Sequence, residues 1–345
     1  MSEPRQEGKI LLMGKYRRPW GSWRFITVGL PLVAIILGLL NIFIWTPFGF
    51  VMTPVGYSFA LIAVFLPLTF LWIPINKKVS KEGVPWYDMV LATLSCAIPL
   101  WFTTQQFEIL MSTWESGAPP VPFILAAILM FLVIEAARRA AGPVLAGTVL
   151  VIALYPLWAC YSPISMLWGQ CFDFHRLASQ QVIGRLGLLG LPMKVFGKLV
   201  MGFLVFAVAI QAAGAGDFFM DLANSLIRKT RAGNAKVAIV ASAMFATISG
   251  AAVPNVLTTG AFTIPAMKKE GLPAHFAGAV EACASAGGTI TPPVMGSAAF
   301  LMAEFIGISY AEVCLAAAIP AGLYFLCLFS QIDAYAAISS AIKSG

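Results

Sequence analysis

The sequence has 345 residues, of which 59% are hydrophobic and 11% are charged, and its mean hydropathy is +0.86. Soluble domains carry about 25% charged residues, so this composition excludes a water-soluble enzyme. The formal charge of +7 lies in short basic clusters between apolar runs, which is typical of membrane topology signals and not of nucleic-acid binding. Counted in spans of about 20 apolar residues, the chain has room for about eight transmembrane helices. It is predicted to be an all-α polytopic membrane protein.

Five apolar runs predict the first membrane spans, at residues 25–45, 56–75, 84–103, 121–134 with its flanks, and 143–160. The connecting segments alternate in basic content, and cytoplasmic segments are the ones rich in Lys and Arg. The basic residues are Arg5, Lys9, Lys15, Arg17, Arg18 and Arg24, then Lys77, Lys78 and Lys81, then Arg138 and Arg139. Segments 46–54 and 105–119 contain neither Lys nor Arg. The N-terminus is therefore predicted to be cytoplasmic and residue 160 to lie outside.

The cysteines show no CxxC pair, and most of them lie inside apolar runs. They are Cys96, Cys160, Cys171, Cys283, Cys314 and Cys327. We expect them to be small packed core residues, not a disulfide framework or a metal site.

Hydropathy weakens between residues 161 and 192, which predicts an external or interfacial connection between two units. Residues 195–213 predict a sixth span. Residues 216–231 predict an amphipathic helix at the cytoplasmic interface. Acidic residues begin this segment and basic residues end it, which complements the helix dipole. These residues are Asp217, Asp221, Arg228, Lys229 and Arg231.

The apolar stretch 236–267 is flanked by basic residues on both sides, so the positive-inside rule places both of its ends in the cytoplasm. Its 32 residues at 1.5 Å each give about 48 Å of helix, less than two crossings of a roughly 30 Å core. A re-entrant helical hairpin is predicted, with its turn among the small and polar residues 247–255. Such backbone persists at that depth only where it is buried in protein or lines an aqueous cavity.

The next apolar run, residues 276–305, is interrupted by the sequence GGTITPP at 287–293. Each arm has about a dozen residues and is too short to span a membrane alone. This pattern predicts a discontinuous transmembrane helix. Residues 313–330 predict a final span that leads to a cytoplasmic tail.

A hairpin tip that faces a broken helix near the membrane midplane can hold an anionic substrate and a coupling cation together. Half-helix N-termini present unpaired N–H groups to the anion, and half-helix C-termini present carbonyls to the cation. Further ligands are the hydroxyls of Ser249, Thr258, Thr259, Thr289 and Thr291 and the amide of Asn255. The structural alternative is that the small residues permit tight helix packing and the hydroxyls bond their own backbone.

Two carboxylates lie in the arms of the broken helix. Intramembrane acids are costly and usually functional, so Glu281 in the first arm is the candidate proton or cation carrier. For Glu304 in the second arm a structural ion pair or a protonated carboxyl in a packing site is favoured. The same structural alternative stays open for Glu281.

Three segments of the chain resemble one transporter family. They read GAGDFFMDLA at 214–223, AKVAIVASAMFATISGAAVPNVLTTGAFTIPAMKKEG at 235–271 and FAGAVEACASAGGTITPPVMGSAAFLMAE at 276–304. They look like the fused permeases of tripartite ATP-independent periplasmic (TRAP) transporters, especially the TAXI type. The resemblance is specific from residue 187 onward. By this resemblance residues 1–140 would be the small four-helix scaffold, 141–192 the fifth span and connection, and 193–345 the first repeat of the transport subunit.

The resemblance implies an elevator-type component of a secondary transporter in a bacterial inner membrane. It would import a carboxylate substrate delivered by a periplasmic substrate-binding protein, coupled to H⁺ or Na⁺ and without a cofactor. The ion-binding or coupling residues would be Ser249, Gly250, Ala251, Asn255, Glu281, Gly287 and Thr289, with Na⁺ held at Ser249, Gly250 and Gly287. The substrate-binding residues would be Thr258, Thr259, Gly288, Thr291, Pro292 and Pro293.

Two departures from the family pattern shape these expectations. Family permeases normally contain a second inverted repeat, and this chain ends after one, so we expect a second permease polypeptide to supply the other half. The hairpin tip reads Ser249-Gly250-Ala251 where the family often reads SGS. The missing hydroxyl favours protons over Na⁺ and makes Glu281 the group to test.

The alternative function is a non-transporting membrane scaffold, in which the first four spans brace a partner and the broken elements are packing irregularities. A membrane enzyme is disfavoured because the sequence contains no HExxH, GxSxG or P-loop motif.

Overall fold

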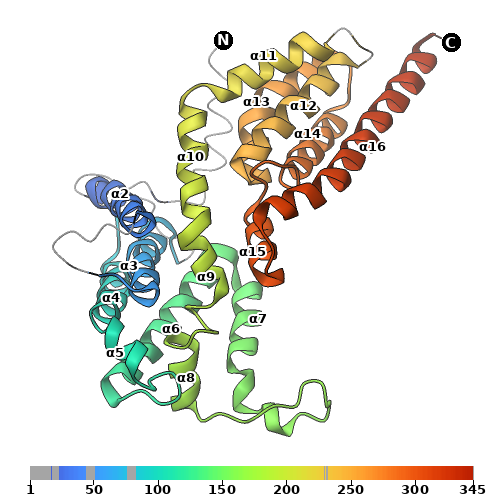
Figure 1. Ribbon diagram of the computed structural model, residues 1–345. Coiled ribbons are helices and arrows are strands. Elements are labelled where there is room, and N and C mark those ends of the chain that lie inside the picture. The colour runs from blue at the N-terminus through green and yellow to red at the C-terminus, as the bar shows by residue number, and fades with distance from the viewer. Residues whose placement is uncertain are drawn as a thin grey trace. The chain divides into compact units, whose positions relative to one another are not determined.

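The computed structural model describes Arg17 and residues 23–43, 51–75, 83–228, 230 and 232–344 (Figure 1). Every regular element within these residues is a helix. The chain divides into two compact units, residues 11–198 and the residues from Leu199 onward. Parts of the topology prediction lie outside the described residues, namely Arg5, Lys9, Lys15, Arg18, Lys77, Lys78, Lys81, Lys229, Arg231 and residues 46–50.

The first unit forms helices where the sequence predicts the first five spans. Its helices are α2 (Trp23–Ile42), α3 (Pro54–Trp72), α4 (Trp86–Thr104), α5 (Gln106–Met111), α6 (Pro120–Ala141), α7 (Pro143–Leu154), α8 (Phe174–Val182) and α9 (Leu191–Val195). The 3-10 turns η2 (Tyr155–Leu157) and η3 (Ala159–Tyr161) follow α7. The fifth predicted span is thus shorter as an α-helix than expected. Helix α8 lies in the segment that the sequence indicated as a connection.

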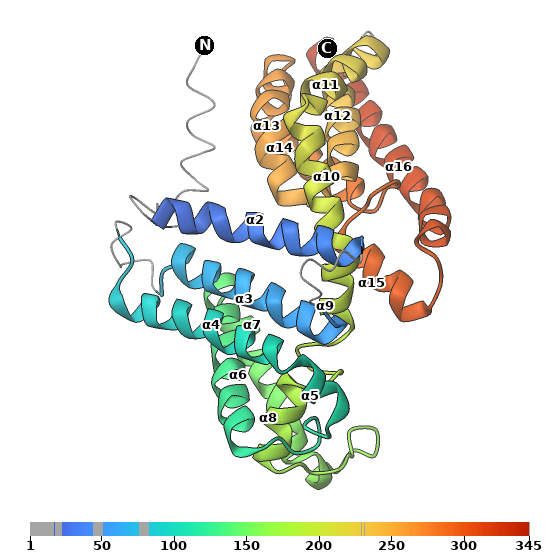
Figure 2. The same ribbon diagram turned by 60° about the vertical axis from the view of Figure 1, so that its left-hand side comes forward.

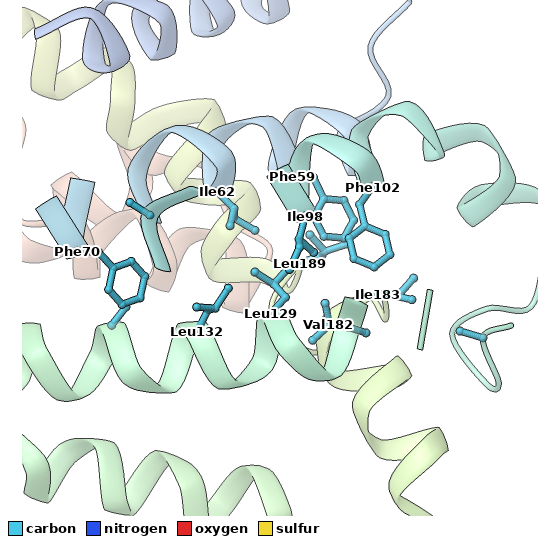
Figure 3. Packing of buried hydrophobic residues seen from close by; sticks show 14 of the residues in the cluster. Phe59, Ile62, Phe70, Ile98, Phe102, Leu129, Leu132, Val182, Ile183 and Leu189 are labelled. Atoms are coloured by element: carbon cyan, nitrogen blue, oxygen red, sulfur yellow. The ribbon is translucent and has the colours of Figure 1, made fainter. Parts of the chain in front are cut away.

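Helix α3 is at the centre of the first unit and contacts α2, α4 and α6 (Figure 2). It is apolar on every face, as a buried helix must be. Phe59 of α3 stacks on Phe102 of α4, with ring centroids 4.9 Å apart. Leu129 of α6 and Val182 of α8 belong to the same buried cluster (Figure 3). Helix α8 therefore completes this core.

A buried charge cluster joins the ends of helices in the first unit. Asp88, in the first turn of α4, lies 2.7 Å from Arg139 and 2.6 Å from Arg17. Arg139, near the end of α6, also pairs with Glu135 at 2.8 Å, and Glu135 pairs with Arg138 at 2.7 Å. The sequence indicated only a cytoplasmic segment at Arg138 and Arg139, and Asp88 was not predicted to pair with Arg139. The cluster ties α4 and α6 together where both helices have an end.

Cys160 and Cys171 form a disulfide bond, with their Cα atoms 5.1 Å apart. The prediction of unpaired cysteines was wrong for these two residues. The chain folds back after α7, where Phe172 N donates to Pro156 O at 2.9 Å and brings the two thiols together. A spacing of 11 residues carries no recognisable motif, so only the fold reveals the pair. Disulfides persist in oxidising compartments, so the external position of this segment stays a prediction that labelling can test.

Counting thiols checks the disulfide. Without reductant, the denatured protein is expected to react with a maleimide at four cysteines: Cys96, Cys283, Cys314 and Cys327. After reduction all 6 cysteines react, and mass spectrometry counts the labels. In intact cells a membrane-impermeant maleimide should reach Cys160 and Cys171 from outside after mild reduction. Six labels without reductant would contradict the disulfide, and labelling only from the cytoplasmic side would contradict the topology.

The second unit begins within a continuous helix of residues Leu191–Ala212. That helix comprises α9, the π-helical turn η4 (Phe196–Val200) and α10 (Met201–Ala212). The unit continues with α11 (Ala215–Ile227), α12 (Gly233–Ser249), α13 (Ala252–Lys269), α14 (Ala274–Gly288), α15 (Ser297–Ile306) and α16 (Tyr310–Ser344). Helix α12 contacts α11, α13 and α14, and α14 contacts α16 (Figure 1). Helix α16 is longer than the span predicted at 313–330.

Small side chains allow these helices to approach closely. Ala235, Ala238 and Ala284 are fully buried in the cluster between α12, α13, α14 and α16, together with Met267 and Ile332. Lys236, at the start of α12, pairs with Asp333 of α16 at 2.6 Å. The hairpin and the final helix are thus joined by both apolar packing and an ion pair.

Among the described residues, four helices are long and apolar enough to cross a membrane: Pro54–Trp72, Pro120–Ala141, Leu191–Ala212 and Tyr310–Ile338. Shorter apolar helices occupy Ile26–Asn41, Pro143–Leu157, Gly233–Ser249 and Ser297–Ile306. By this measure neither α12 nor α15 is long enough to span a membrane alone. The re-entrant course of the hairpin stays a prediction.

Candidate functional site

The hairpin turns within two residues. Helix α12 ends at Ser249, Gly250 takes the left-handed conformation with φ +64°, and Ala251 is extended before α13 begins. A Cβ on Gly250 would lie 2.7 Å from Met295 O, so both the backbone conformation and the space require glycine here. The Ser249 hydroxyl lies 3.4 Å from Ala251 O and 3.5 Å from Ala246 O. At the tip, the Ser249 hydroxyl oxygen therefore lies close to two backbone carbonyl oxygens.

The helix break follows the end of α14 at Gly288 and lies against this tip. Gly296 N donates to Thr289 O at 2.7 Å and closes the loop before α15 begins. The Pro292-Pro293 peptide bond is cis. A Cβ on Gly296 would lie 3.2 Å from Gly250 O. The structure thus brings the hairpin turn and the helix break together, which is the arrangement that the site hypothesis requires.

The end of α14 has no room for a side chain. A Cβ on Gly288 would lie 2.3 Å from the Ala246 Cβ and 2.8 Å from Ala243 O. A Cβ on Gly287 would lie 2.4 Å from the Tyr324 ring. The two glycines let α14 pack directly against α12 and α16.

Replacing Gly288 by alanine is expected to lower the free energy of unfolding by about 1–3 kcal/mol, because α12 and α14 must separate to admit the methyl group. Gly278→Ala is the matched control on the same helix, since a Cβ there meets no atom within 4 Å. The control should be neutral or stabilising by up to about 1 kcal/mol. Thermal unfolding of the detergent-solubilised protein measures both variants. Equal melting temperatures for the two variants would contradict the close packing.

A cavity of about 740 Å³ opens beside the tip and is called the tip cavity. Gly250, Ala252, Thr289, Gly296, Ser297 and Ala298 line it, together with residues of α15 and α16. Helices α13 and α15 both begin at this cavity, and neither start has a side-chain cap. The first turn of each helix therefore presents uncapped N–H groups and a positive dipole end there.

Not all the predicted substrate residues share that cavity. Thr291, Pro292 and Pro293 line a separate cavity of about 500 Å³ with residues of α11, α12 and α16. Thr258 is exposed on α13, and its hydroxyl donates to Pro254 O at 2.8 Å. Thr259 is buried in the interior of the hairpin.

Most of the predicted hydroxyls bond to their own backbone. Thr289 donates to Ala286 O at 2.7 Å, and Thr291 donates to Gly287 O at 2.8 Å. A hydroxyl whose proton is used in this way offers only lone pairs to a ligand. These oxygens suit a cation, whereas an anion at the site must be bound by backbone N–H groups.

A second group of predicted residues forms a buried cluster, called the polar cluster, between α12, α13 and α14. Asn255 Nδ2 donates to Ser242 O and Oγ, each at 2.9 Å, and to Ser285 Oγ at 2.8 Å. The two serine hydroxyls are 2.9 Å apart. Thr259 Oγ1 lies 3.4 Å from Ser242 Oγ and also contacts Glu281 Oε1. Asn255, Ser242, Ser285 and Glu281 are 0% exposed.

Sequence reasoning found Asn255, Thr259 and Glu281 but missed three members of the polar cluster. These are Ser242, Thr263 and Ser285. Thr263 follows Thr259 by one helical turn, so the i, i+4 spacing could have indicated it. The two serines face these residues from α12 and α14 in a register that the sequence does not reveal. The described residues contain no group of three or more His, Cys, Asp and Glu side chains placed to hold a metal ion.

Comparison with known proteins identifies the family of the chain. The model of the family "Tripartite ATP-independent periplasmic transporter, DctM component" matches residues 128–344. An uncharacterized protein of Sinorhizobium fredii, y4mL, is 25% identical over 211 residues, which cover 59% of this chain and 46% of that protein. A Haemophilus influenzae protein provisionally named a TRAP transporter large permease is 28% identical over 189 residues. These residues cover 54% of this chain and 42% of that protein.

No solved structure gives a significant match. The chain spans less than half the length of the curated relatives it matches. The family match covers more than half of the chain, from the middle of α6 to the end of α16, and includes the hairpin, the helix break and the polar cluster. With several apolar helices that are typical of a multi-pass membrane protein, the chain belongs to the DctM component family of tripartite ATP-independent periplasmic transporters.

Proposed function

We propose that the protein is the permease of an ion-coupled secondary transporter that imports a carboxylate substrate across a bacterial inner membrane. A periplasmic binding protein delivers the substrate, and the N-terminus lies in the cytoplasm. The observation that carries the proposal is the tip cavity, where the hairpin turn and the starts of two helices meet in a chain of the DctM family. We also propose that the transporter is of the TAXI type and that the N-terminal part of the chain is a small subunit fused to the permease.

The tip cavity has the size and polarity for a small carboxylate. Its volume of about 740 Å³ lies within the usual range of roughly 300–1,000 Å³ for small-molecule sites. The uncapped N-termini of α13 and α15 supply N–H donors for the anion. The rest of the lining is mostly apolar, for example Ile290, Met302 and Val313. Such a lining suits the carbon skeleton of an organic acid.

The coupling ion binds beside the substrate or within the polar cluster. The carbonyls and hydroxyl at Ser249, Gly250 and Gly287 are the proposed ligands for Na⁺, and Glu281 is the proposed carrier for H⁺. The hairpin is re-entrant in the membrane, and the unit that carries it moves as an elevator between the two sides. A second inverted repeat, on a partner polypeptide, completes the transport unit, and membrane lipid surrounds the assembly.

Ligand-dependent stabilisation tests this function against the scaffold alternative. Carboxylates that the transporter accepts should raise the melting temperature of the protein, purified with the polypeptides that accompany it, because a ligand of the folded state stabilises it by mass action. Ala298→Asp places a negative charge in the first turn of α15 beside the cavity and should abolish the shift. Ala298→Asn, of similar shape but uncharged, should retain it. A panel of mono- and dicarboxylates that stabilises no preparation would support the scaffold.

A further inference from the structure

The Glu281 carboxyl group lies in a site built around it. Its side chain crosses Gly260 of α13, where a Cβ would lie 3.2 Å from Glu281 Cγ. Thr263 Oγ1 lies 2.6 Å from Oε2, and Thr259 Oγ1 contacts Oε1. A methyl group at Gly260 would therefore fit only if the Glu281 side chain moved by a few tenths of an ångström. The residues of α13 are thus arranged to receive this one side chain of α14.

No positive charge neutralises Glu281 among the described residues. On the helices packed against it, Lys236 pairs with Asp333, Tyr324 donates to Cys283 O at 2.9 Å and Glu270 accepts from Asn234 N at 3.2 Å. Lys268, Lys269, His275 and Cys283 are exposed. Burying a carboxylate without a charged partner costs several kcal/mol, a cost that a bound proton or cation would remove.

The polar cluster also contains a hydrogen-bond acceptor that has no donor. Asn255 Oδ1 is buried and has no donor, although both protons of the same amide group have acceptors. One additional proton on Glu281 would free a threonine hydroxyl to donate within the network. The hydroxyls of Thr259 and Thr263 already contact the two carboxyl oxygens, so a proton can be accommodated without moving either residue.

We infer that Glu281, Thr259 and Thr263 form a proton-binding site that fastens α13 to α14 inside the hairpin bundle. The inference rests on the proposed function, in which this proton is the coupling ion. With the proton bound, the carboxyl group is neutral and bridges the two helices. When the proton leaves, a bare negative charge remains in the interior and draws in water or a cation, which loosens the outer arm of the hairpin. The hydroxyls of Ser242 and Ser285 continue the hydrogen-bond network from Thr259 toward α12.

Infrared spectroscopy of the purified, membrane-reconstituted protein tests the site directly. At neutral pH we expect a C=O stretching band of a protonated carboxylic acid that Glu281→Gln removes and Glu304→Gln keeps, since Glu304 is exposed on α15. Thr259→Val and Thr263→Val should shift the band, because each removes one hydrogen-bond partner. Thr258→Val, at the exposed neighbouring position, should leave it unchanged. Glu281→Gln should keep the melting temperature, because glutamine has the shape and neutrality of the protonated acid.

Two results would overturn the inference. One is a spectrum with no protonated-acid band that depends on Glu281. The other is a band that Na⁺ removes at constant pH, which would make the site an alkali-cation site. Failure of the inference differs from failure of the proposed function: carboxylate-induced stabilisation would persist in the first case and be absent in the second.

Discussion

Replacement of Glu281 by glutamine is expected to abolish carboxylate uptake driven by a pH gradient. Glutamine keeps the contacts with Thr259 and Thr263 but cannot release or bind the transported proton. Net uptake into proteoliposomes should therefore fall to the level of protein-free vesicles. Exchange of internal for external substrate, which needs no net proton movement, should continue. The measurement compares both fluxes of labelled substrate in one preparation that contains the chain, its partner polypeptide and the binding protein.

Glu304→Gln is the matched control for this experiment. Glu304 also lies on the broken helix, but it is exposed, and no ion pair joins it to another described residue. It is expected to retain the response of uptake to the pH gradient. An unchanged pH response in Glu281→Gln would reject the role of Glu281 in coupling. Loss of exchange together with net uptake would instead place Glu281 in substrate binding.

Removal of the Asp88 carboxylate is expected to have the largest effect on stability. Asp88 contacts both Arg17 and Arg139, and all three side chains are at most 1% exposed. Asp88→Ala leaves two buried guanidinium groups without this partner, which should lower the free energy of unfolding by about 3–5 kcal/mol. Arg139 keeps its contact with Glu135, so the loss should be largest around α4 and Arg17. Thermal and denaturant unfolding in detergent measure the change.

A control variant and a double variant test whether the loss of stability comes from the buried charge cluster. Glu108→Ala removes an exposed acidic side chain from α5 and should change the stability little. The double variant Asp88→Ala/Arg139→Leu removes the stranded charge as well and should recover part of the loss. If Asp88→Ala and Glu108→Ala melt at the same temperature, the cluster does not hold these helices together.

The sequence predicted those parts of the fold that depend on local chemistry. Apolar runs located the helices, the small and polar residues 247–255 marked the hairpin turn, and the sequence at 287–293 marked the helix break. These signals are local because glycine and proline act on their own backbone and because span length is a property of one segment.

Contacts between distant helices were not accessible to that reasoning. Asp88 and Arg139 are separated by 51 residues, and nothing in either local pattern shows that they meet. Ser242 and Ser285 are unremarkable within their own helices and become part of the polar cluster only through the register of α12 against α14. The pairing of Cys160 with Cys171 likewise depends on the fold of the segment after α7. The sequence could identify Glu281 as unusual, but only the structure shows which residues surround it.

The central claim is that this permease couples carboxylate import to an ion gradient, and flux measurements with separately imposed gradients test it most directly. Proteoliposomes containing the chain with its partner polypeptide are supplied with the periplasmic binding protein and labelled carboxylate. An inward H⁺ gradient alone should drive accumulation, a Na⁺ gradient alone should not, and omission of the binding protein should stop uptake. Absence of accumulation under either gradient, with the protein folded and the binding protein loaded, would contradict the account.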